Sequence, residues 1–301
     1  MLFNYQSFLP NFDKEFVTFF TKKKTVLFFH ILTTGTYWRT SKITGLQILE
    51  IQDFANAPFE IKCWNTETEE DEYELLVMLS SYIQESDCVI GYNSTSFHLP
   101  YLKNKYKAYG LTDPFSHTEH MDLLKLCKPT GAALSISMKL SDLRLYFKLD
   151  DNEPELKVIV YTLQLLKYKQ FFFGDFSVTS VEKDTDCIYA KINTNIKYLE
   201  PLHLNHDAFY LMLEEHSCKV MIRLFDGALR VYYPNYKDYY YLASEDMIIH
   251  KSMCSGISKD KLIKATCENC YQKIVPPKEV SIPYLTKYLT MLFQYFYNTL
   301  K

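Results

Sequence analysis

The sequence has few arginines, no excess of basic charge and no long apolar run. Only four of its 33 basic residues are arginine, and 36 acidic residues bring the formal net charge to −3. A protein that holds nucleic acid mainly by neutralising phosphates usually carries a basic excess, so net charge gives no support to strong non-specific binding. A local basic patch is compatible with this balance. Because no apolar run approaches the ~20 residues that span a bilayer, we expect no transmembrane helix and no membrane partner.

The eight cysteines are scattered, and several lie in apolar runs. The N-terminus has no signal-peptide pattern, so we expect reduced thiols and a cytoplasmic protein. One group, His250, Cys254, Cys267 and Cys270, has the ligand types that can hold zinc. A single Cys-x2-Cys pair is a weak signal, and packing thiols are the favoured interpretation.

Aromatic residues are abundant, at 16% of the chain. The tyrosine run from Tyr232 to Tyr241 is either a base-stacking platform or a β-hairpin with one face on the core. The hairpin is favoured, because stacking platforms normally accompany a basic groove.

Apolar runs and helical spacings alternate in the first half of the chain, which predicts an α/β fold. Residues 24–31 have the pattern of a buried central strand, and residues 43–51 and 59–64 are expected to extend it into an antiparallel meander. An amphipathic helix around 75–83 and a strand over 87–93 then favour a parallel crossover.

Later segments are predicted to be mostly helical. The strongest candidate is 193–217, and a β-hairpin, a short helix over 244–254 and a final helix over 283–300 are expected after it. We therefore divide the chain into an N-terminal segment, a core domain and a C-terminal extension packed on the core. Their boundaries are 1–23, 24–218 and 219–301.

Three motifs resemble the signatures of DnaQ-type 3′–5′ exonucleases, in the same order. Residues 26–35 (VLFFHILTTG) resemble the strand that carries Asp-x-Glu-Thr-Thr-Gly, and residues 90–102 (IGYNSTSFHLPYL) resemble the second signature. Residues 203–207 (HLNHD) resemble the third, which lies on a helix in the family. Over about 24–280 the chain is similar to the bacterial YprB-like ribonuclease-H-like family.

The resemblance implies a ribonuclease-H-like mixed β-sheet flanked by helices. About five strands are expected, with a three-strand antiparallel meander, parallel strands and a C-terminal hairpin and helix extension. It also implies a metal-dependent 3′–5′ exonuclease, which uses two Mg²⁺ or Mn²⁺ ions roughly 4 Å apart. Such hard cations require oxygen ligands, which the family supplies from four carboxylates.

Most of these carboxylates are replaced in this sequence. His30, Leu32 and His98 stand where the family has Asp, Glu and Asp, and only Asp207 remains, with His203 one helical turn before it. We therefore expect a catalytically degenerate protein with no bound cofactor.

The residues around the replaced ligands are better preserved. By the resemblance, Thr33, Thr34, Asn93 and Phe97 would contact nucleic acid, and the expected partner is single-stranded. The sequence identifies no protein partner.

Two alternatives stay open. One is an active exonuclease with altered ligands, in which His30, His98 and Asp207 hold a softer metal such as Zn²⁺ or Mn²⁺. The other is a protein-interaction scaffold that binds no nucleic acid.

Overall fold

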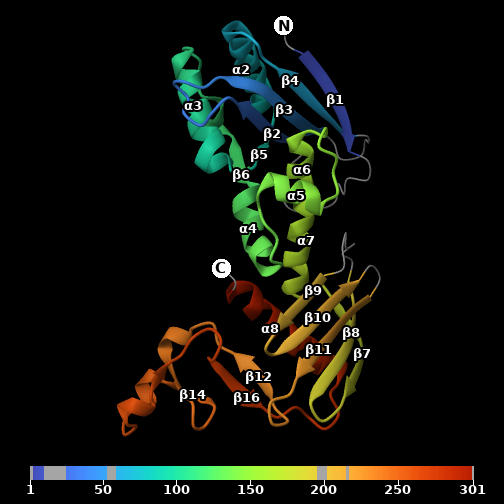
Figure 1. The fold of residues 1–301 in the computed structure, drawn as a ribbon, viewed down its shortest axis with the longest axis vertical. Coiled ribbons are helices and arrows are strands. Elements are labelled where there is room, and N and C mark those ends of the chain that lie inside the picture. Colours follow the sequence, from blue (N-terminus) through green and yellow to red (C-terminus); the bar gives the residue numbers. More distant parts are fainter. Residues whose placement is uncertain (1–2, 10–24, 53–58, 195–201, 215–216, 300–301) are drawn as a thin grey trace. The chain divides into compact units, whose positions relative to one another are not determined.

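The computed structural model describes residues 3–9, 25–52, 59–194, 202–214 and 217–299. Most of the predicted N-terminal segment, including Lys22 and Lys23, lies outside these ranges. The chain divides into two compact units (Figure 1). The first contains residues 1–128 and 137–166, and the second contains residues 129–136 and 167–301. Each helix within the described ranges is too short or too polar to cross a bilayer.

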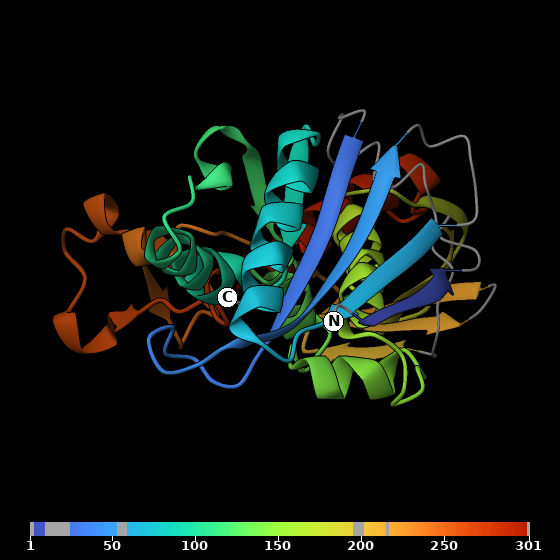
Figure 2. The same cartoon turned by 90° about the horizontal axis from the view of Figure 1, so that it is seen from above.

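The first unit is built on a mixed sheet. Strands β2, β3 and β4 form the predicted antiparallel meander, and β5 and β6 continue the sheet in parallel, which confirms the mixed α/β architecture. Strand β1 adds a sixth strand, antiparallel to β4. The order across the sheet is β1 (Phe3–Leu9), β4 (Phe59–Asn65), β3 (Ile43–Gln52), β2 (Thr25–Thr33), β5 (Cys88–Gly91) and β6 (Glu119–Asp122). Figure 2 shows these strands fanning out with the twist of the sheet.

Strand β2 lies in the interior of this sheet and is apolar on both faces. Successive side chains of a strand point to opposite faces, so Leu27, Phe29 and Ile31 share one face. This face packs against α2 (Glu69–Gln84) and α3 (Leu99–Ala108) in one buried cluster. The side chain of His30 lies on the opposite face of the sheet.

A tight turn joins β5 to α3. Asn93 has a left-handed backbone, with φ 54°, and a short π-helix over Ser94–His98 leads into α3. Pro100 lies in the first turn of α3, where its missing N–H is tolerated, so it marks the start of this helix.

Four helices follow the sheet of the first unit along the chain. Asp122, the last residue of β6, accepts a hydrogen bond from the backbone N–H of Leu124 at the start of the first of them. Their bounds are α4 (Leu123–Ala133), α5 (Leu140–Tyr146), α6 (Glu155–Tyr161) and α7 (Leu163–Phe172).

The second unit is built on an antiparallel five-stranded sheet. Its inner face packs on α8 (Ile282–Thr299), with the Phe209 and Phe293 ring centroids 5.4 Å apart. Phe171 and Phe172 of α7 join the same aromatic cluster. The strand order is β7 (Ser177–Lys183), β8 (Cys187–Asn193), β11 (Ser217–Arg223), β10 (Phe209–Glu214) and β9 (Leu202–His206).

The predicted helix over 193–217 is wrong, because its described residues form strands and the turns between them, from the end of β8 to the start of β11. Phe209, Leu211 and Leu213 are buried while the residues between them are partly exposed, and this alternation has the period of a strand. The unit boundary lies near residue 166 rather than between 218 and 219, because β11 pairs with β8 and β10 in one sheet.

The C-terminal tyrosine-rich segment forms two small sheets rather than the predicted hairpin. Strand β12 (Leu229–Tyr232) pairs with β16 (Tyr271–Ile274). Strand β13 (Tyr239–Leu242) pairs with β14 (Met247–His250) and β15 (Ile263–Lys264), so the predicted helix over 244–254 is also wrong. The final helix is confirmed as α8.

The close approach at Gly91 predicts a stability effect. A Cβ atom there would lie 2.6 Å from Cβ of Ser94 and 3.0 Å from the Phe29 ring, so Gly91→Ala must displace the turn. We expect it to lower the free energy of unfolding by about 1–3 kcal/mol, measured by urea denaturation. Gly35→Ala is the matched control, because its Cβ would meet only Ser41 at an ordinary 3.5 Å. Equal losses in both variants would contradict this account.

Candidate functional site

The candidate site lies near the C-terminal end of β2, where the first sequence motif ends. His30 pairs with Gln47 of β3, and Leu32 pairs with Gly45 two residues further along. His30 is buried, with 7% of its surface exposed, and Leu32 is half-buried. The strand register shifts directly after Leu32, so the regular strand ends at these two residues.

His30 forms the central contact of this site. Its Nε2 lies 2.6 Å from Oε2 of Glu155, the first residue of α6. An ionised carboxylate only accepts hydrogen bonds, so the imidazole is the donor. This hydrogen bond is the main cause that lowers the pKa of Glu155, against the opposing effect of its partial burial.

Gln47 fixes the same helix end from the neighbouring strand. Its Oε1 accepts a hydrogen bond of 2.8 Å from the backbone N–H of Leu156. First-turn N–H groups have no partner within a helix, and this side chain satisfies one of them. The start of α6 is therefore held to β2 by His30 and to β3 by Gln47.

His98 lies against His30, with ring centroids 4.9 Å apart in an edge-on arrangement. It is buried, with 3% of its surface exposed, and its ring also contacts Phe29 and Phe97. Burial holds the pKa of His98 well below its usual value, and His30 and His120 lower it further. His98 is therefore a neutral imidazole at physiological pH.

Both rings retain unused hydrogen-bonding capacity. The Nδ1 atoms of His30 and His98 are buried and have no hydrogen-bond partner within the described part of the chain. A protonated ring needs an acceptor at each nitrogen, so the unpartnered Nδ1 of His98 is consistent with its lowered pKa.

Asp122 is near the second motif but has a capping role. Its Oδ2 accepts a hydrogen bond of 2.9 Å from the backbone of Thr95, and Oδ1 accepts one from Leu124. The carboxylate thereby fixes the π-helix to the start of α4. Both oxygens therefore accept backbone hydrogen bonds.

Of the predicted contacts, Thr33 is the last residue of β2 and Thr34 begins the turn that follows. The hydroxyl of Thr33 donates to the carbonyl of Gly35, and that of Thr34 accepts from the backbone N–H of Lys42. The turn is thus closed by its own side chains, which orients both threonines.

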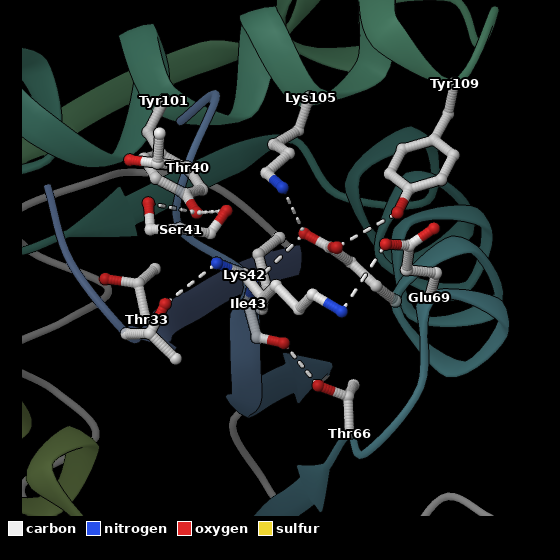
Figure 3. A network of polar contacts seen from close by, with 12 residues as sticks. Thr33, Thr40, Ser41, Lys42, Ile43, Thr66, Glu69, Tyr101, Lys105 and Tyr109 are labelled. Carbon is white, nitrogen blue, oxygen red and sulfur yellow. Dashed lines mark hydrogen bonds and ion pairs between the residues drawn. The ribbon is translucent and has the colours of Figure 1, made fainter. Parts of the chain in front are cut away.

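A buried polar network anchors the far end of this turn (Figure 3). Oε1 of Glu72 lies 2.9 Å from Nζ of Lys105 and accepts from the backbone N–H of Ile43, and Tyr109 donates to Oε2. Each oxygen of this buried carboxylate is therefore paired, as burial of a charge requires.

The other two predicted contacts belong to the turn before α3. Asn93 supplies the left-handed residue, a conformation that asparagine tolerates better than most residues. Phe97 is half-buried against the core and stacks edge-on against His98. The structure therefore places Phe97 with His30 and His98 in one aromatic cluster.

His203 and Asp207 do not lie on a helix, so that expectation is wrong. They lie in the second unit, on β9 and in the β9–β10 turn. Nδ1 of His203 is 2.5 Å from the hydroxyl of Tyr210, and the backbone carbonyl of Asp207 accepts from Arg223. The helical face that would have joined these two residues does not exist, because the segment has strand periodicity.

The residues around His30 do not fit two Mg²⁺ ions. Two imidazoles, one alkyl side chain and the single carboxylate of Glu155 replace the oxygen ligands that such ions require. No cluster of three or more potential ligands suited to a metal ion occurs among the described residues. This holds for the His30, His98 and Asp207 candidate and for the cysteine group at His250.

Sequence reasoning missed Glu155 and Gln47. Glu155 follows Pro154 at the start of a helix, and an acidic residue in a first helical turn is a recognisable signal. Its contact with His30 joins residues 125 positions apart, which the local pattern does not reveal.

The His30–Glu155 hydrogen bond predicts a measurable pKa change. His30→Ala removes the largest cause that lowers the pKa of Glu155, so the pKa of this carboxyl should rise. Titration of the side-chain carboxyl by ¹³C NMR measures it directly. His98→Ala is the control and should leave the Glu155 pKa close to that of the unsubstituted protein. An unchanged pKa in His30→Ala would contradict the assigned hydrogen bond.

Comparison with known proteins finds a family match that lies mostly in the first unit and low similarity to solved structures. The family model of the RNase H superfamily matches residues 27–160. No curated protein matches the sequence.

The similar solved structures include two of exonuclease I. A product-bound one is 14% identical, with TM-score 0.39, over 57% of this chain and 58% of that chain. Another is 13% identical, with TM-score 0.37, over 64% and 55%. A family B DNA polymerase from the archaeon Pyrobaculum calidifontis is 17% identical, with TM-score 0.32, over 50% and 25%. The chain thus spans a little over half the length of these exonuclease I chains.

The matched residues 27–160 include strands β3 to β6 of the mixed sheet. This α/β segment is what the chain shares with the RNase H superfamily model.

Proposed function

We propose that this protein binds single-stranded nucleic acid on an RNase H-like scaffold and does not hydrolyse it. The observation that carries the proposal is the replacement site itself, in which His30 contacts both His98 and Glu155. The resemblance to the YprB-like branch makes this a degenerate member of an exonuclease class.

The absence of hydrolysis is argued from the donor set. Two-ion phosphodiester cleavage needs one cation to activate water and another to stabilise the leaving oxygen. Glu155 is the carboxylate beside His30, and it is already hydrogen-bonded. Leu32 adds an apolar side chain at the position where the family has a bridging carboxylate. Neutral His98 supplies no negative charge to offset two divalent ions.

Retention of binding is supported by the ordered shell around the replaced residues. The turn with Thr33 and Thr34 is closed by its own hydrogen bonds and anchored through Glu72. Phe97 lies beside the histidine pair. The match of residues 27–160 to the RNase H superfamily favours nucleic acid as the ligand class over a protein partner alone.

A reducing compartment fits this proposal. The eight cysteines are scattered along the chain, and Cys88, Cys127, Cys218 and Cys270 are buried. Scattered cysteines in apolar surroundings are typical of cytoplasmic proteins.

The proposal predicts binding without cleavage. The full chain should raise the fluorescence anisotropy of labelled single-stranded DNA or RNA equally with Mg²⁺ and with a chelator, because no bound cation takes part. The same samples on a denaturing gel should show intact oligonucleotide in Mg²⁺, Mn²⁺ and Zn²⁺.

Two outcomes would contradict it. Metal-dependent cleavage that is lost in Glu155→Gln but kept in Glu153→Gln would establish an active nuclease with altered ligands. A folded protein that binds neither single strand would instead favour the interaction scaffold.

A further inference from the structure

The outer face of the five-stranded sheet in the second unit carries tyrosine, lysine and methionine side chains, whereas its inner face is apolar and buried. In β8, β10 and β11 alternate residues are buried, and the intervening side chains form the outer face. A groove of about 290 Å³ lies over this face. We use the name tyrosine–lysine face for six of its lining residues: Tyr189, Lys191, Tyr210, Met212, Lys219 and Met221.

Two tyrosine rings lie in one row across the strands. Met221 pairs with Tyr210 on one side and with Tyr189 on the other. Tyr189 is 41% exposed, a large value for an aromatic residue in the middle of a sheet. The hydroxyl of Tyr210 is hydrogen-bonded to Nδ1 of His203, which restricts the orientation of its ring.

The adjacent row carries two like charges. Lys219 and Lys191 are direct cross-strand partners, and both are exposed. Like charges in directly opposite positions destabilise a sheet. Within the described residues no carboxylate forms an ion pair with either ammonium group. The nearby carboxylates of Glu182 and Asp184 lie beside Tyr189 instead, at the β7–β8 side of the face. The lysine row is therefore complementary to an anion.

We propose that the tyrosine–lysine face is a binding site for single-stranded nucleic acid. Bases stack on Tyr189 and Tyr210, and phosphates lie near Lys191 and Lys219. Aromatic side chains beside a positively charged groove are the combination by which single strands are held without sequence preference. Apolar and aromatic groups alone would suit a protein partner equally well. The two lysines, which form no ion pair within the described residues, favour nucleic acid as the ligand.

This inference rests on the proposed nucleic-acid function but locates binding in the second unit. The probe is a fluorescein-labelled single-stranded oligo(dT) of about 12 nucleotides, within the site sizes of known single-strand binding folds. The full chain is compared with Tyr189→Ala/Tyr210→Ala and with Lys191→Glu/Lys219→Glu. Lys259→Glu/Lys261→Glu is the matched control, because it makes the same charge change at exposed residues elsewhere in the unit. Circular dichroism establishes that each variant is folded.

We expect the tyrosine variant to raise Kd about tenfold or more, since stacked bases contribute strongly to single-strand affinity. The lysine variant should also reduce the slope of log affinity against log salt by about 0.7 for each phosphate that its side chains no longer neutralise. The control should keep at least most of the affinity. If Tyr189→Ala/Tyr210→Ala is unfolded, Tyr189→Leu/Tyr210→Leu removes the rings but keeps apolar bulk and should show the same weakening.

Each contrary outcome has a distinct meaning. If the unsubstituted chain binds and both face variants bind equally well, this inference fails while the proposed function stands. If the unsubstituted chain does not bind, the proposed function fails together with the inference. Self-association in sedimentation that the tyrosine variant abolishes, without oligonucleotide binding, would establish a protein interface and overturn the proposal.

Discussion

The hydrogen bond between His30 and Glu155 is the contact on which the candidate site depends. It joins the central strand β2 to the first residue of α6, and Gln47 supports the same helix end from β3. In a site built for divalent ions, neighbouring carboxylates repel one another until cations bind. Here an imidazole and a carboxylate attract each other, so the site is stable with protein groups alone.

This contact also explains the state of the neighbouring groups. His98 packs against His30 in a buried aromatic setting that keeps it neutral, and Leu32 adds apolar surface at the strand end. The ordered turns on either side, with Thr33 and Asn93, persist because their own hydrogen bonds and backbone geometry hold them. These contacts hold the turns in place without a bound cation. Under the proposed function, such a scaffold could bind nucleic acid without cleaving it.

The sequence predicts the first unit well and the second unit poorly, for physical reasons. The strands at 24–31, 43–51 and 59–64 are apolar runs bounded by turns, and each is confirmed. The helix predicted over 193–217 is wrong because a histidine and an aspartate four residues apart favour a helix, whereas the burial of Phe209, Leu211 and Leu213 has period 2. Glu155 is not predictable from local spacing, because its role comes from a tertiary contact.

We propose that the histidine pair at β2, His30 with His98, does not serve as a divalent-cation site. Paramagnetic Mn²⁺ broadens NMR signals of nearby nuclei, so its addition tests this claim at individual residues. The imidazole resonances of His30 and His98 should keep their line widths at substoichiometric Mn²⁺, behaving like those of His250 in the second unit. Selective broadening of the His30 and His98 signals, reversed by chelator, would show that a cation binds there and would contradict the account.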